Sequence, residues 1–126
     1  MPLIGEFHPA VFEGVDPDEW HGLIATGCRI FCELGADVIK TFFTDERFEE
    51  IAASVPVPIL ILGSKKLPRE RDALDLAERA VARGARGVAI GRNIFQARDP
   101  ARMLSALRAV VKERIPARDA AALVEG

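Results

Sequence analysis

The sequence predicts an α/β fold in which helices cover a parallel sheet. Four short apolar runs alternate along the chain with longer segments whose apolar residues recur every three or four positions. The runs are apolar throughout, as expected for parallel strands buried on both faces. Two architectures fit this order: an open doubly wound sheet, which would place the first strand centrally, or four units of an eight-unit (β/α) barrel.

Each strand is expected where an apolar run is bounded by turn-forming residues. Pro56 and Pro58 stand at the entry to the third run, where proline is tolerated because few ladder hydrogen bonds are lost. The four expected strands are residues 3–7, 37–42, 57–62 and 87–90.

The expected helices are recognised by their first residues. Asp16 and Asp99 can each act as an N-cap, and each is followed by proline at the first helical position. Thr44 or Asp45 can cap a shorter helix. The expected helices are residues 17–34, 44–53, 68–83 and a last one from residue 100 onward.

Composition indicates a globular chain and argues against several function classes. The 126 residues suffice for one domain with a core, and 49% are hydrophobic and 29% charged. The net charge of −2 argues against nucleic-acid binding, which favours a basic surface. No apolar run approaches the roughly 20 residues of a membrane span, and the first residues do not resemble a secretory leader. We therefore expect a cytoplasmic protein.

Two cysteines, Cys28 and Cys32, stand four residues apart on the first expected helix and share one face. A metal site would need more ligands, and a disulfide within one regular helix is poorly placed. We expect core thiols in a reducing compartment, with no metal and no cofactor.

Polar residues follow each expected strand. Ligands of both candidate architectures bind beyond the carboxyl ends of parallel strands, so these residues form one candidate rim. In strand order they are Glu6 and His8; Lys40; Gly63, Ser64, Lys65 and Lys66; and Gly91, Arg92 and Asn93.

Lys40 is the strongest candidate for a catalytic residue. Surrounded by Val38, Ile39 and Phe42, its amine should be desolvated, which disfavours the charged form. A neutral amine can attack a carbonyl carbon and form a Schiff base, and Glu6 or His8 could transfer protons beside it. The alternative is a lysine that merely reaches from the strand end to solvent.

Two glycine-containing segments favour phosphate binding. Gly63, Ser64 and Lys65 combine backbone N–H groups with a cation, and Gly91 and Arg92 repeat this combination before a short helical stretch. Loops after the last two strands of (β/α) barrels often bind phosphate together with such a stretch. Each segment alone is also compatible with a plain turn.

Three segments together resemble the archaeal-type class I fructose-bisphosphate aldolases, a family that includes the autoinducer-2 phosphate thiolase and the aminodideoxyheptulosonate synthase. The segments are residues 33–41, 57–68 and 85–96, within a likeness over residues 23–113. The resemblance implies the C-terminal half, strands 5–8, of a TIM (β/α)8 barrel. It also implies a Schiff-base lyase or related thiolase that acts on a phosphorylated ketose-like substrate.

The resemblance assigns roles position by position. Lys40 matches the Schiff-base lysine. Gly63 and Ser64 match a phosphate-binding loop that is usually Gly-Gly, and Gly91 and Arg92 match the second phosphate-binding segment.

The first expected strand departs from the family pattern. Family aldolases carry a Tyr-Pro there, with the tyrosine as proton donor, but this chain contains no tyrosine. His8 stands in that place before Pro9, with Glu6 two residues earlier. A different aldol or acyl-transfer substrate is therefore expected.

Four βα units would leave sheet edges unpaired, which favours association. We assign residues 1–115 to a half-barrel and 116–126 to a less ordered C-terminal tail. The expected partners are a phosphorylated small molecule and either a second copy or a complementary N-terminal half-barrel, without nucleic acid or membrane. A non-catalytic half-barrel that binds a phosphorylated metabolite or a partner is the alternative function.

Overall fold

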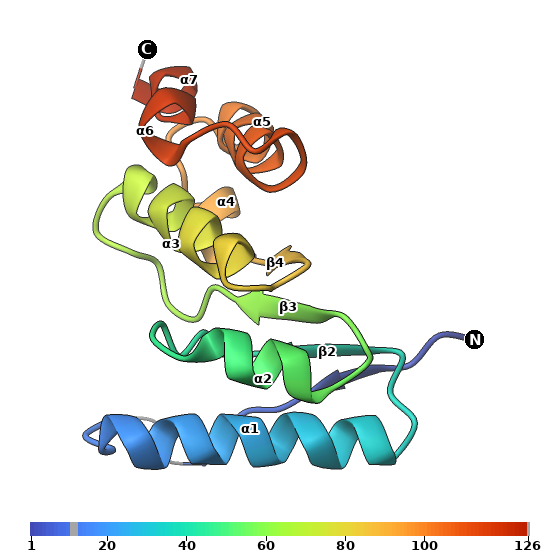
Figure 1. The fold of residues 1–126 in the computed structure, drawn as a ribbon. Helices are drawn as coiled ribbons and strands as arrows, with labels where there is room; N and C mark the ends of the chain where they lie inside the picture. The colour runs from blue at the N-terminus through green and yellow to red at the C-terminus, as the bar shows by residue number, and fades with distance from the viewer. Residues whose placement is uncertain (11–12, 126) are drawn as a thin grey trace.

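The computed structural model describes residues 1–10 and 13–125. In this part of the chain, parallel strands form one sheet in the order β1-β2-β3-β4 (Figure 1). The strands are β1 (Ile4–Glu6), β2 (Val38–Thr41), β3 (Ile59–Leu62) and β4 (Gly87–Ala89). This sequential order is that of consecutive units of a (β/α) barrel, and it excludes the open sheet with a central first strand.

A helix follows each strand. In chain order these are α1 (Pro17–Glu33), α2 (Phe48–Ser54) and α3 (Glu70–Ala82), and then α4 (Arg92–Phe95) and α5 (Pro100–Glu113) after β4. α1 and α2 lie side by side on the same side of the sheet (Figure 1). None of the helices in the described ranges is long and apolar enough to cross a membrane.

The helix ends agree with the sequence in two cases and differ in a third. Asp16 and Asp99 cap α1 and α5 through side-chain oxygens, as predicted. α2 begins only at Phe48, however, because Asp45 and Arg47 have left-handed φ angles of 59° and 63° and form a turn first.

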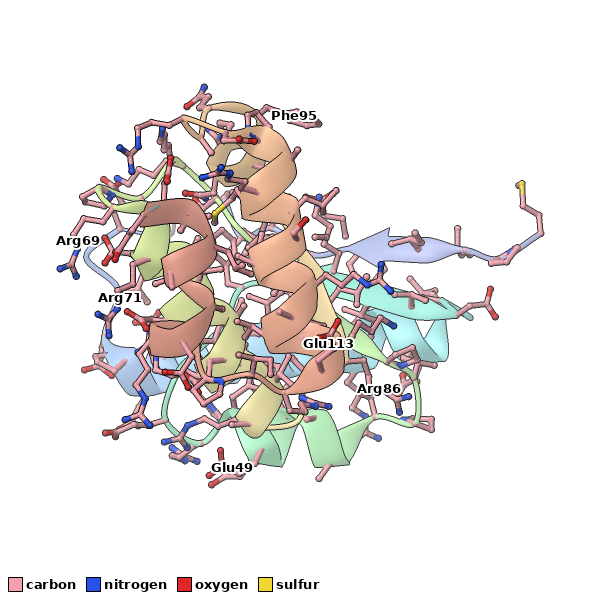
Figure 2. The ribbon with its side chains drawn as sticks, turned by 90° about the horizontal axis from the view of Figure 1, so that it is seen from above. Glu49, Arg69, Arg71, Arg86, Phe95 and Glu113 are labelled. Atoms are coloured by element: carbon pink, nitrogen blue, oxygen red, sulfur yellow. The ribbon has the colours of Figure 1, made fainter. Side chains whose placement is uncertain are left out.

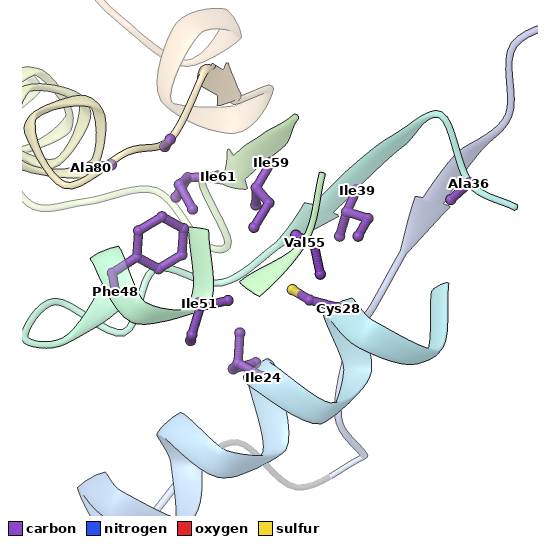
Figure 3. Close-up of a cluster of buried hydrophobic side chains, with 11 residues drawn as sticks. Ile24, Cys28, Ala36, Ile39, Phe48, Ile51, Val55, Ile59, Ile61 and Ala80 are labelled. Atoms are coloured by element: carbon purple, nitrogen blue, oxygen red, sulfur yellow. The ribbon is translucent and has the colours of Figure 1, made fainter. Parts of the chain in front are cut away.

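A hydrophobic cluster holds α1 and α2 against the middle of the sheet (Figure 3). Its strand residues and helix residues are at most 2% exposed, and full burial of each large one contributes roughly 1.5–3 kcal/mol. They include Ile39, Ile59 and Ile61 from the strands and Ile24, Cys28 and Ile51 from the helices. Burial raises the pKa of the Cys28 thiol to about 11, whereas Cys32 is only partly buried.

The second face of the sheet is more open than the apolar runs predict. In β2, Ile39 and Thr41 are fully buried, whereas Val38 and Lys40 at the alternate positions are partly exposed. Ile4 in β1 is 60% exposed. The expectation of strands buried on both faces is wrong here, because α1 and α2 cover only the face that carries Ile39.

The segment after Pro116 is helical, not a loose tail. It forms α6 (Ala117–Ala120) and α7 (Ala122–Glu125), while residue 126 lies outside the described part. Its apolar side chains complete a second cluster with α3 and α5, and the Ala117 N–H donates to Glu78 Oε2 at 3.3 Å. The expectation of low order is wrong because alanines and Val124 supply a face that α3 and α5 can bury.

The two ends of the sheet carry different side chains. Figure 2 shows Phe95, on α4 beyond the carboxyl end of β4, well separated from Arg86, which precedes β4. The carboxyl-end rim that the sequence predicts therefore lies on the Phe95 side of the molecule.

Candidate active site

Glu6 and Lys40 lie opposite each other on neighbouring strands. They are direct partners in the β1–β2 register, and the Phe7 N–H continues the pairing to the Lys40 carbonyl at 2.9 Å. The Lys40 ammonium Nζ donates to a Glu6 carboxylate oxygen at 3.1 Å. Their side chains are 29% and 50% exposed, so the pair is accessible at the open face of the sheet.

The surroundings of the Lys40 amine are less apolar than the sequence predicts. Strand alternation places the side chain of Ile39 on the opposite, helix-covered face, where it is fully buried. The group beside the amine is the Glu6 carboxylate, and the Lys40 side chain keeps part of its solvent contact. The expectation of a desolvated amine is therefore not met in this structure.

His8 lies just beyond the end of β1 and is held from two sides. Its Nδ1 is 3.2 Å from the carbonyl oxygen of Pro9, a contact that requires the hydrogen on Nδ1. Its ring meets Phe42 edge-to-face, with centroids 4.8 Å apart, and Phe42 packs in turn against Trp20. The imidazole is thus fixed at the rim by the segment that follows β2.

The loops after β3 and β4 approach each other closely. A Cβ added at Gly63 would lie 2.9 Å from side-chain carbons of Ile90, so only glycine fits there without a shift. The next residue, Ser64, has a φ of 47°, in the left-handed region that glycine adopts more readily. Gly91 and Arg92 follow Ile90 and are exposed.

One pocket collects nearly all the predicted site residues. Its volume is about 260 Å³, and it opens at the carboxyl ends of the four described strands. The proton-transfer candidates and the lysine lie along one part of its lining, and both phosphate-loop candidates lie along the other. The lining residues are Glu6, His8, Lys40, Leu62, Gly63, Ser64, Ala89, Gly91 and Arg92.

Among the residues to which the sequence assigns a catalytic or phosphate-binding role, Lys65 is the one that does not line the pocket. Its side chain is 78% exposed, and its Nζ lies 3.6 Å from Glu13 Oε1. A cation beside a glycine in the sequence does not reveal its direction, and here Lys65 is directed toward another part of the surface.

Comparison with known proteins assigns the chain to a family. The sequence model of the DeoC/LacD family aldolases matches residues 10–97, which is more than half of the chain. The chain belongs to the DeoC/LacD aldolase family. The predicted resemblance to class I aldolases is confirmed by this match.

Curated relatives of this DeoC/LacD family member include thiolases. It is 53% identical over 92 residues to the 3-hydroxy-5-phosphonooxypentane-2,4-dione thiolase of Enterobacter sp. (strain 638), covering 73% of this chain and 31% of that protein. It is 58% identical over 83 residues to the thiolase of the same name from Yersinia enterocolitica, covering 66% and 28%. The chain thus spans about a third of the length of these relatives.

Solved aldolase structures share its fold. An archaeal fructose 1,6-bisphosphate aldolase superposes with a TM-score of 0.77 at 32% identity, over 88% of this chain and 45% of that one. A Schiff-base-forming fructose-1,6-bisphosphate aldolase superposes with a TM-score of 0.76 at 33% identity over the same shares. These likenesses show that the four βα units of this family member form part of a TIM-type barrel.

The sequence places Asn93 at the candidate rim but assigns it no role. It is only 4% exposed, and its amide contacts three backbone groups of residues 63–67. Its position after Gly91 and Arg92 is the one sequence signal that could have singled it out.

Proposed function

We propose that the chain supplies the lysine and the phosphate-binding part of a Schiff-base aldolase or thiolase that acts on a phosphorylated ketose-like substrate. The observation that carries the proposal is the single pocket lined by Lys40, by Glu6 and His8, and by both glycine loops. The names of the relatives support it: a thiolase of a phosphorylated dione, and an archaeal aldolase whose catalytic lysine is covalently bound to a carbinolamine intermediate.

In the proposed reaction, the unprotonated Lys40 Nζ attacks the carbonyl carbon of the substrate to give a carbinolamine. Loss of the former carbonyl oxygen as water leaves an iminium ion. The iminium accepts the electron pair of the neighbouring C–C bond when that bond breaks. The other fragment leaves as a carbonyl compound or, in a thiolase, as an acyl group that a thiol co-substrate accepts. The enamine that remains on Lys40 is protonated to an iminium, and water hydrolyses this iminium to the product ketone and the free lysine.

Glu6 and His8 would transfer the protons that these steps require. The Glu6 carboxylate lies 3.1 Å from Nζ, within the distance for direct proton transfer from the ammonium group. His8 takes the place of the tyrosine that family aldolases use, and its Nδ1 contact with Pro9 fixes the ring.

The phosphate group would bind between the two glycine loops. Backbone N–H groups at Gly63, Ser64 and Gly91 would donate to its oxygens, and the exposed guanidinium of Arg92 would pair with its charge. Lys65 is not part of this proposed site, because its amine is directed toward Glu13.

Borohydride trapping tests the proposal. Incubation with dihydroxyacetone phosphate and borohydride should reduce the iminium to a stable secondary amine, and peptide mapping should place it on Lys40. Lys112, exposed on α5, is an internal control and should stay unmodified. Lys40→Met should abolish the adduct, whereas an adduct that persists in this variant would contradict the assignment.

The two edges of the sheet favour association with a partner. Among the described strands, β1 pairs only with β2 and β4 only with β3, and Leu3 and Ile4 at the β1 edge are 53% and 60% exposed. An apolar groove of about 440 Å³ lies beside β4, lined in part by Leu104 and Leu107. We propose that a second copy of this chain or a complementary half-barrel pairs with these edges. The proposed location of the protein is the cytoplasm.

The small pocket also favours a partner. Its volume of about 260 Å³ is below the roughly 300–1,000 Å³ of pockets that enclose small ligands, so a second barrel half would complete it. The alternative function is a non-catalytic half-barrel that binds a phosphorylated metabolite. A monomer in sedimentation that binds sugar phosphate without forming an adduct would favour this alternative.

A further inference from the structure

Asn93 is a buried amide at a rim whose neighbouring residues are exposed. It is 4% exposed, while Gly91 and Arg92 just before it lie at the surface. A buried side-chain amide is costly unless its donors and its acceptor are hydrogen-bonded. Its partners therefore show what this position does in the fold.

All three partners of the Asn93 amide belong to the loop after β3. Nδ2 donates to the carbonyl oxygens of Gly63 and Lys65, each at 3.3 Å. Oδ1 accepts from the Leu67 N–H at 2.7 Å. The side chain of Asn93, just after Gly91 and Arg92, thus hydrogen-bonds to three backbone groups of the loop of residues 63–67.

These contacts fix the directions of backbone N–H groups that Asn93 does not touch. In a trans peptide the C=O and the following N–H point in opposite directions. The Gly63 carbonyl is turned toward Asn93, so the Ser64 N–H is turned away from it. Ser64 lines the pocket, and its φ of 47° is of the kind found in anion-binding turns of successive N–H groups.

We propose that Asn93 is a positioning residue that holds the loop of residues 63–67 so that the Ser64 N–H faces the phosphate group of the substrate. The inference rests on the proposed function. It adds that phosphate affinity depends on a side chain that does not touch the phosphate.

The test compares two ketones in the same borohydride trapping reaction. Asn93→Asp keeps the shape and the acceptor for Leu67 but removes both donors and places a carboxylate against two carbonyl oxygens. The concentration of dihydroxyacetone phosphate for half-maximal trapping should rise about tenfold or more, as the loss of such hydrogen bonds predicts. Trapping of unphosphorylated dihydroxyacetone on Lys40 should change less than about twofold.

Gln96→Glu is the matched control. Gln96 is exposed three residues further along, so this substitution adds the same negative charge without touching the three contacts. Its effect on dihydroxyacetone phosphate should be less than about threefold, since exposed charges interact weakly in water.

Several outcomes would overturn the inference. If Asn93→Asp raised the half-maximal trapping concentration equally for both ketones, Asn93 would have a merely structural role. If Asn93→Asp and Gln96→Glu raised the concentration for dihydroxyacetone phosphate equally, the added charge alone would explain the effect. Asn93→Ala, which removes the amide donors without adding charge, allows the same comparison of the two ketones if Asn93→Asp fails to fold. Failure of the wild-type chain to trap either ketone would instead count against the proposed function.

Discussion

The alternation of side chains along each strand determines which rim residues are exposed to solvent. Lys40 faces the open side of the sheet and pairs with Glu6, whereas Ile39, its neighbour, is buried beneath α1 and α2. The sequence could identify Lys40 because it ends an apolar strand. It could not predict that Lys65 turns toward Glu13, or that Asn93 is buried, because both depend on contacts with residues about 30 to 50 positions away.

Cys28 provides a prediction at the scale of one ionisable group. Burial favours the neutral thiol and raises its pKa from the ordinary 9.0 to about 11. Between these two pH values the unfolded chain releases a proton that the folded chain keeps, so the stability that the buried thiol contributes falls as pH rises from about 9 to 11. Thermal melts at pH 8 and pH 10.5 test this. The fall in Tm between the two pH values should be smaller for Cys28→Ala than for the wild type, and an equal fall in both proteins would contradict a raised pKa of the Cys28 thiol.

The elements of this fold are predicted well where their ends carry caps and less well where the chain turns. Asp16 and Asp99 mark α1 and α5, and both caps form. The late start of α2 follows from left-handed φ angles at Asp45 and Arg47. Aspartate adopts such angles more often than most residues, but an arginine gives no such signal in the sequence. The helices after Pro116 were missed because they are short and depend on packing against α3 and α5 rather than on their own propensity.

Two glycines within α1 provide a matched pair. A Cβ at Gly27 would overlap the Phe7 ring, whereas a Cβ at Gly22 would meet nothing within 4 Å. Gly27→Ala should therefore destabilise the fold by about 1–3 kcal/mol through overpacking against Phe7. Gly22→Ala should stabilise it by about 0.5–1 kcal/mol through helix propensity alone.

Urea unfolding measures both free energies. The changes in the free energy of unfolding should have opposite signs for the two substitutions. This difference is the critical result, because helix propensity acts equally at the two positions. If Gly27→Ala were also stabilising, the close approach of Phe7 to α1 would be wrong.

At the scale of the whole molecule, the sequence predicts the parallel α/β class and narrows the architecture to two. The strand order then selects consecutive barrel units, and the family match confirms the resemblance. The partner of the open edges could not be predicted in the same way, because an unpaired edge shows that a strand can be added there but not which chain supplies it.

The central claim is that Lys40 and the two glycine loops act on one phosphorylated carbonyl compound. Competition by inorganic phosphate in the borohydride trapping reaction tests it most directly. Phosphate should suppress formation of the Lys40 adduct with dihydroxyacetone phosphate and leave the adduct with unphosphorylated dihydroxyacetone unchanged. Equal suppression of both adducts, or of neither, would contradict a phosphate site in the same pocket as the lysine.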